Sequence, residues 1–248
     1  SMINKMPFAL IIFFIFLSCS PKSDEAVMER ERKVTGRSSI NSQIKKLCES
    51  LEDAKNDHDR ALVCTDIASL YNEKGNVSAS IDYSQKAVKY QPNLFMSHYL
   101  LGKAYNAAGR YDEAEKEMVL SITLKGDFAP SHFELGNAYY KKYNYNGAVS
   151  EYHATVRLDP KNHQAFNNLA AVLAAGFRFG EAESALKSAI QVKPDFAPAY
   201  KNLGVLYETR MKNYLLAIQN YRKYLELRPN SSDGNRVRSW IRVLGGVI

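Results

Sequence analysis

The chain has 248 residues, of which 46% are hydrophobic, with eight prolines and thirteen glycines. A chain of this length and composition can bury a large core, which excludes a protein that is disordered throughout. The formal net charge of +7 would suit nucleic acid or a membrane surface. The basic residues are scattered along the chain, however, which favours a solvated surface and argues against a nucleic-acid partner.

The first eighteen residues differ from the rest of the chain. Lys5 is followed by an uninterrupted apolar run from Phe8 to Leu17, which is too short to span a bilayer. A basic start, a short apolar run and a small residue before the cleavage point are typical of a secretory signal peptide, here residues 1–18. The alternative is an apolar anchor that is not cleaved.

The residues at the end of this run resemble the lipobox of bacterial lipoproteins. The stretch is Phe16-Leu17-Ser18-Cys19, with a small residue directly before the cysteine. The resemblance implies that Cys19 is lipidated, becomes the mature N-terminus and attaches the protein to a bilayer. Residues 19–40 are otherwise polar and charged, so we expect them to form a flexible tether.

Residues 41–60 are expected to hold a single capping helix, over residues 42–55. Asn41 or Ser42 could cap its start, and apolar residues follow at helical spacing. These apolar residues are Ile44, Leu47, Cys48 and Leu51.

Residues 61–231 repeat one pattern five times at an interval of 34 residues. Each copy contains a small residue. An aliphatic residue directly precedes it, and a large residue follows it three positions later. The copies are Ile67-Ala68-x-x-Tyr71, Leu101-Gly102-x-x-Tyr105, Leu135-Gly136-x-x-Tyr139, Leu169-Ala170-x-x-Leu173 and Leu203-Gly204-x-x-Tyr207. A second small position holds Ala114, Ala148 and Ala182, and Ala217 follows one residue late. The last copy therefore carries one extra residue near Met211 to Tyr214.

The spacing has a direct physical reading. Gly102 and Ala114 are small where two helices must approach closely, while Leu101 and Tyr105 lie four residues apart on one helical face. Each helical hairpin would still expose an apolar face that only a neighbouring hairpin can cover. The hairpins should therefore stack one on the next.

This pattern resembles the tetratricopeptide repeat family, whose unit is a helix, a turn and an antiparallel helix. The resemblance implies an all-α fold, a right-handed α-solenoid of five hairpins between an N-terminal and a C-terminal capping helix. The hairpins fall at residues 61–94, 95–128, 129–162, 163–196 and 197–231. Residues 232–248 would form the C-terminal capping helix, with Asp233 at its start and Val237, Trp240, Ile241 and Leu244 facing the array.

No residues stand in a spacing that serves catalysis or metal binding. The chain has five histidines but no HExxH, no glycine-rich phosphate loop and no serine-centred elbow. His98 and His132 occupy the same repeat position, where the family packs a large residue between helices, and no further ligand completes a metal set. We therefore expect no enzyme activity, no cofactor and no metal.

The family lines a concave groove with the first helix of each repeat, chiefly through its second, fifth, ninth, twelfth and thirteenth residues. The fifth positions here begin with Thr65. Aromatic rings beside amide side chains in these columns suit an extended or helical peptide, and the alternative is that the rings pack along the groove floor. The candidate groove residues are Tyr99, Lys103, Asn106, Phe133, Asn137, Tyr140, Asn167 and Lys201.

Cys48 and Cys64 are the two cysteines besides Cys19. In a compartment that oxidises thiols, an antiparallel arrangement of the capping helix and the next helix would bring them near each other. A disulfide and two buried free thiols are both open from the sequence.

These features predict a membrane-anchored scaffold or assembly adaptor in the bacterial cell envelope, lipid-anchored at the outer membrane, that binds a peptide or protein in its groove. The architecture is similar to that of the pilot lipoproteins that help to assemble pilus secretins. The alternative is a surface-exposed lipoprotein that binds extracellular or host molecules. Chaperone-binding members of the family hold a C-terminal carboxylate with a run of residues that includes Lys and Asn. This chain lacks that run.

The lipoprotein hypothesis predicts that Cys19→Ala releases the repeats from the membrane fraction, because no acyl chain can then be attached. Fractionation of cells and mass spectrometry of the mature N-terminus test this. A Cys19→Ala chain that stays in the membrane fraction and keeps residues 1–18 would show that the apolar run is an uncleaved anchor.

Overall fold

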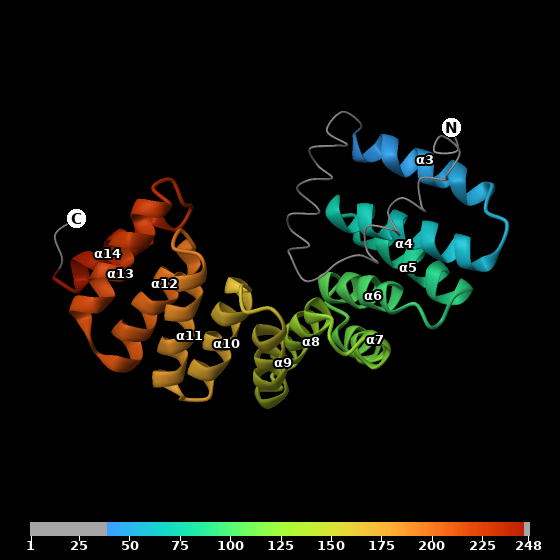
Figure 1. The fold of residues 1–248 in the computed structure, drawn as a ribbon. Helices are drawn as coiled ribbons and strands as arrows, with labels where there is room; N and C mark the ends of the chain where they lie inside the picture. The colour runs from blue at the N-terminus through green and yellow to red at the C-terminus, as the bar shows by residue number, and fades with distance from the viewer. Residues whose placement is uncertain (1–38, 246–248) are drawn as a thin grey trace, which may run out of the picture. The chain divides into compact units, whose positions relative to one another are not determined.

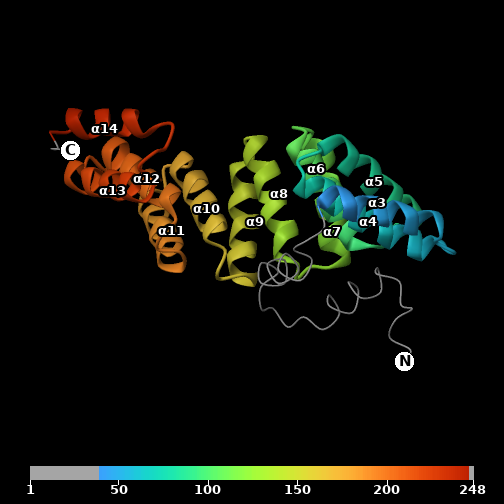
Figure 2. The ribbon, with the colours of Figure 1, turned by 90° about the horizontal axis from the view of Figure 1, so that it is seen from above.

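The computed structural model describes residues 39–245, and this part of the chain is entirely helical, with no strand (Figures 1 and 2). The predicted signal peptide, Cys19 and nearly all of the tether lie outside the described residues. No helix among the described residues is long and apolar enough to cross a bilayer. The all-α prediction is confirmed.

The chain divides into two compact units, residues 1–126 and 127–248. The helices of unit 1 are α3 (Ile40–Glu52), α4 (Asp57–Glu73), α5 (Val77–Tyr90), α6 (Phe95–Ala107) and α7 (Tyr111–Leu124). Those of unit 2 are α8 (Ala129–Lys141), α9 (Tyr145–Leu158), α10 (His163–Ala175), α11 (Phe179–Val192), α12 (Ala197–Leu206), the π-helix η2 (Tyr207–Met211), α13 (Tyr214–Leu227) and α14 (Gly234–Val243). Each predicted repeat is thus a hairpin of two helices.

Asparagine side chains start several of these helices. At each such start the asparagine precedes the first helical residue, and its side chain accepts a hydrogen bond from a backbone N–H in the first turn, which would otherwise lack a partner. These residues are Asn56, Asn76, Asn144, Asn162 and Asn213.

The N-terminal capping helix begins earlier than predicted. Its N-cap is Ser39, whose side chain accepts from the Ser42 N–H, so neither Asn41 nor Ser42 caps the helix. The reason is that residues 40–42 already have helical geometry, and a cap must lie outside it. Ile44 and Leu47 of α3 pack with Val63 and Ile67 of α4, which confirms that the helix covers the first hairpin.

In three of the five hairpins, a glycine on the first helix faces a large side chain on the second. A Cβ on Gly102 would lie 2.8 Å from the Met118 side chain, on Gly136 2.7 Å from the Tyr152 ring, and on Gly204 2.4 Å from the Tyr221 ring. These distances are shorter than any normal carbon contact. Glycine is therefore required for the two helices to approach this closely.

The extra residue of the last repeat is absorbed by the π-helix. The widened turn at Tyr207–Met211 is followed by Lys212 in the left-handed conformation, with a φ of 54°, and α13 starts two residues later. A π-helix takes in one more residue than an α-helix does over the same rise. Ala217 and Tyr221 consequently remain buried at their repeat positions.

The C-terminal helix α14 closes the array as predicted. Val237 and Ile241 are fully buried in the core of unit 2, and Trp240 and Leu244 pack against it. The Trp240 ring lies 5.3 Å from that of Tyr221 on α13.

The close helix approach predicts a ranking of Gly→Ala changes. Gly204→Ala should lower the free energy of unfolding most, by about 2 kcal/mol, because the Tyr221 ring is rigid and has no room to move. Gly102→Ala should lower the free energy of unfolding by less, because the Met118 side chain is flexible and can move away from the added methyl group. Gly180→Ala in α11 is the control, since nothing lies within 4 Å of its added Cβ, and it should stabilise by up to about 1 kcal/mol. Urea unfolding measures the series, and equal losses at Gly102 and Gly204 would contradict it.

Candidate functional site

The candidate groove residues lie on the first helices of their hairpins, in both units. Tyr99, Lys103 and Asn106 are on α6 of unit 1, and the others are on α8, α10 and α12 of unit 2.

In unit 1, Tyr99 and Lys103 form one pair. The Lys103 ammonium lies 5.8 Å from the centre of the Tyr99 ring, and Asn106 is half-buried one turn further along the same helix. Thr65, at the fifth position of the preceding repeat, is buried and does not line an open face. Its hydroxyl donates to the Ala61 carbonyl at 2.7 Å and contacts the Ser97 hydroxyl at 2.9 Å, so it joins α4 to α6.

In unit 2, four asparagine side chains are linked across three helices, and we call them the amide ladder. The Asn202 amide of α12 donates to the Asn167 carbonyl oxygen at 2.8 Å. Asn167 donates to its neighbour Asn168 at 3.3 Å, and Asn168 donates to Asn137 of α8 at 3.1 Å. The ladder thus runs over the face that α8, α10 and α12 share, and all four residues are half-buried.

Tyr152 and Glu134 fix one end of the amide ladder. The Tyr152 hydroxyl donates to the Asn137 carbonyl oxygen at 2.8 Å, and Asn137 donates to Glu134 at 3.2 Å. Tyr152 is almost fully buried, and burial raises the pKa of its hydroxyl. Its ring is held by packing, so the orientation of the Asn137 amide is set before any ligand arrives.

The two predicted aromatic contacts on α8 differ from each other. Phe133 packs against the core and its ring lies 6.0 Å from that of Tyr152, which agrees with the alternative that this ring belongs to the groove floor. Tyr140 is 37% exposed and its ring lies 6.2 Å from that of Tyr145. Tyr140 is therefore the more open of the two.

Lys201 is engaged within the chain. Its ammonium donates to Asp233 at 3.0 Å, and the Tyr224 hydroxyl donates to the other oxygen of the same carboxylate at 2.5 Å. These two hydrogen bonds, from Tyr224 and then Lys201, lower the pKa of Asp233. Lys201 therefore joins α12 to the start of α14, and it would have to leave Asp233 to contact a ligand.

Two of the four asparagines of the amide ladder, Asn168 and Asn202, were not among the predicted groove residues. Asn168 and Asn202 occupy the sixth position of consecutive repeats, 34 residues apart. That recurrence was visible in the sequence. An amide side chain offers two donors and two acceptors, and the ladder bonds use only some of them, so the face keeps capacity to bond a ligand.

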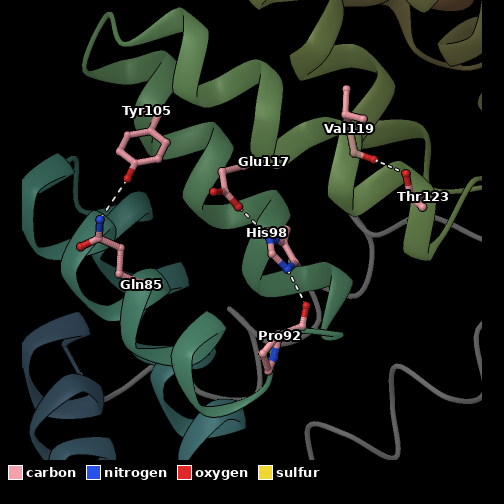
Figure 3. A network of polar contacts seen from close by, with 7 residues as sticks. All are labelled: Gln85, Pro92, His98, Tyr105, Glu117, Val119 and Thr123. Carbon is pink, nitrogen blue, oxygen red and sulfur yellow. Dashed lines mark hydrogen bonds and ion pairs between the residues drawn. The ribbon is translucent and has the colours of Figure 1, made fainter.

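The histidines His98 and His132 each pair with a carboxylate of their own hairpin, and Figure 3 shows the pair of His98. His98 Nδ1 lies 2.6 Å from Glu117 Oε2, and its Nε2 lies 2.8 Å from the Pro92 carbonyl oxygen. Both partners of His98 are acceptors, so the protonated ring can donate from both nitrogens. In the α8–α9 hairpin, His132 Nδ1 likewise lies 2.7 Å from Glu151 Oε2. Among the described residues no group of three or more side chains could hold a metal ion.

The cysteines Cys48 and Cys64 are free thiols in the described structure. Cys64 is fully buried, and burial raises the pKa of its thiol to about 11. Cys48 Sγ lies 3.8 Å from the Tyr83 hydroxyl. The disulfide stays a prediction for an oxidising compartment.

Stacked helical hairpins with polar side chains along one shared face define a repeat protein of the helical-hairpin class. The family model of the tetratricopeptide repeat matches residues 65–121, 133–178 and 173–232. The chain belongs to the tetratricopeptide repeat family.

One similar protein is human protein O-mannosyl-transferase TMTC3, which is 30% identical over 166 residues. The match covers 66% of this chain, and the mouse protein gives the same values. The chain spans only 16% of the length of these relatives.

Several solved structures have the same fold. YrrB, described as a tetratricopeptide repeat protein with an unusual peptide-binding site, has a TM-score of 0.62 at 19% identity, covering 78% of this chain and 97% of that one. PilF of Pseudomonas aeruginosa gives 0.66 at 15% identity, covering 75% and 84%. MamA of Desulfovibrio magneticus RS-1 gives 0.62 at 18% identity, covering 69% and 97%. At these identities the likeness establishes the fold alone.

The His98 pair predicts a pH dependence of stability. The hydrogen bond to Glu117 raises the pKa of His98 above its ordinary 6.5, burial opposes the rise, and the Pro92 carbonyl adds to it. Because the folded pKa is the higher one, the stabilisation is fully present below pH 6.5 and is lost as the pH rises through the raised pKa. Urea unfolding at a series of pH values should show this loss in the wild type and a flatter profile in His98→Gln. Identical profiles for the two chains would contradict the assignment.

Proposed function

We propose that this protein is a non-enzymatic scaffold that binds an extended peptide segment of a partner protein on the face shared by α8, α10 and α12. The observation that supports the proposal is the amide ladder of Asn137, Asn168, Asn167 and Asn202. A peptide backbone carries one donor and one acceptor per residue, and amide side chains complement both.

The dimensions of the face suit an extended chain. Packed helices lie about 10 Å apart, which is the length of about three extended residues. A peptide that crosses from α8 to α12 would therefore meet one asparagine of the ladder every few residues. Tyr140 at the α8 end provides an apolar surface for a side chain of the peptide, as exposed aromatic rings commonly do at interfaces.

We further propose that the scaffold is a lipoprotein, anchored through Cys19 at the outer membrane of a bacterium, where it acts as an assembly adaptor. The lipobox resemblance of Phe16 to Cys19 supports the anchor. The transferase activity named for TMTC3 is not proposed for this chain, because the match spans only 16% of that protein.

The alternative is a surface-exposed lipoprotein that binds extracellular or host molecules through the same face. Protease treatment of intact cells distinguishes the two locations. Digestion of the repeats in intact cells would favour the surface, and protection until the outer membrane is permeabilised would favour the periplasm.

The peptide-binding proposal predicts that Asn168→Ala combined with Asn202→Ala weakens binding by about tenfold or more, because each lost hydrogen bond contributes about 1 kcal/mol. Peptides would be selected from a displayed library on the wild-type chain and measured by titration calorimetry. Asn146→Ala, an exposed asparagine on α9 outside the ladder, is the matched control and should leave the affinity unchanged. Equal affinities of the wild type, the double variant and the control would contradict the assignment.

A further inference from the structure

The turn inside each hairpin has one residue in the left-handed conformation. In unit 1 this residue is glycine, Gly75 and Gly109, with φ of 76° and 75°. In unit 2 it is Tyr143, Phe177 and Lys212, with φ of 60°, 61° and 54°. A bulky side chain is disfavoured in this conformation, so the backbone gives no reason for an aromatic residue at either turn.

These two aromatic residues are also strongly exposed. Tyr143 is 78% and Phe177 is 74% exposed, and each ring lies edge-on to a second ring two residues later, that of Tyr145 at 6.3 Å or Phe179 at 6.0 Å. At the third turn Leu215 is 68% exposed, and Tyr214 and Met211 are also exposed. The exposed residues therefore form a series with one apolar tip per hairpin of unit 2. We call Tyr143, Phe177, Met211, Tyr214 and Leu215 the turn row.

The three turns lie at the same end of their hairpins. The ladder bonds from Asn137 to Asn168 and from Asn167 to Asn202 hold α8, α10 and α12 side by side. Since each of these helices leads into the turn of its hairpin, the turns follow one another along one edge of unit 2. The second and third turns lie next to each other, because the Arg210 guanidinium is 5.8 Å from the centre of the Phe179 ring.

Basic residues are interleaved with the turn row. Five of them lie in or beside the turns, namely Lys141, Lys142, Arg178, Arg210 and Lys212. The acidic residues there are engaged within the protein. Glu181 pairs with Arg178 at 2.6 Å, and Glu208 accepts from the Tyr221 hydroxyl at 2.6 Å. The edge is therefore both apolar and positively charged.

We propose that the turn row docks unit 2 onto an anionic lipid surface. Aromatic and aliphatic side chains on protruding turns can enter the boundary between headgroups and acyl chains, and neighbouring Lys and Arg residues contact the phosphates. Each basic residue near an anionic bilayer strengthens such binding. The row lies at the hairpin ends and contains none of the ladder asparagines, and it requires neither the peptide nor a lipid on Cys19.

The experiment places a fluorescent reporter on the row in the full chain. Phe177→Trp is made in a Trp240→Phe background, which keeps an aromatic ring against Tyr221. Asp195→Trp in the same background is the matched control, because Asp195 is exposed beyond the opposite end of α11, about 20 Å away along a helix of this length. Both proteins are bound to vesicles of equal parts phosphatidylglycerol and phosphatidylcholine that contain brominated lipid.

We expect the tryptophan at position 177 to shift to shorter wavelength and to be quenched several-fold more than the one at position 195. Changing Lys141, Lys142 and Lys212 to Gln should remove most of this difference, because the charge attraction is lost. Equal quenching at both positions, or no quenching at position 177 while the protein sediments with the vesicles, would overturn the proposal. A wavelength shift at position 177 on addition of a library-selected peptide, without lipid quenching, would assign the row to a protein ligand and also overturn it.

A second variant excludes a structural role for the rings. Tyr143→Gly with Phe177→Gly restores the residue that unit 1 has at this turn position, so the melting temperature should be unchanged or higher. In the Asp195→Trp background this variant should still bind the selected peptides. A vesicle-binding defect without a folding or peptide-binding defect supports the proposal, whereas a large fall in melting temperature would show that the rings are structural.

Discussion

The close approach of two helices within each hairpin is the constraint on which the rest of the structure depends. The backbone of Gly136 lies against the Tyr152 ring and that of Gly204 against the Tyr221 ring, at distances that leave no space for a methyl group. Tyr152 is then positioned so that its hydroxyl reaches Asn137, and Tyr221 so that its hydroxyl reaches Glu208. The packing of the interior thus determines where polar groups appear on the surface.

The fold could be predicted from the sequence because its determinants are local and periodic. The 34-residue interval of Gly102, Gly136 and Gly204 specifies where helices meet, and asparagines such as Asn76 and Asn144 specify where second helices begin. The start of α3 was placed too late, because Ser39 and Asn41 are equally good capping residues and only the backbone distinguishes them. The hydrogen bonds of Asp233 occur only at the C-terminal end of the array. Because they do not recur from repeat to repeat, no periodic pattern in the sequence could predict them.

The candidate site was harder to predict than the fold. The position of a residue within its repeat shows which helix face it lies on, but it does not show which residue its side chain contacts. Asn137 and Asn167 were placed correctly on the first helices, but their bonds to Asn168 and Asn202 cross between repeats and follow from the stacking. Lys201 shows the opposite case. Its column suits a ligand contact, yet a carboxylate from the C-terminal helix neutralises it.

The π-helix before α13 has a consequence for how such arrays change in length. One residue inserted inside an α-helix would rotate every later side chain by about 100° and move the apolar stripe away from the core. Here the widened turn takes up the added residue before Lys212 and α13, and Tyr221 still meets Gly204. Repeat length is therefore not fixed by packing. The junction between the two helices of a hairpin is a place where an array can accumulate insertions during evolution while every downstream helix keeps its register.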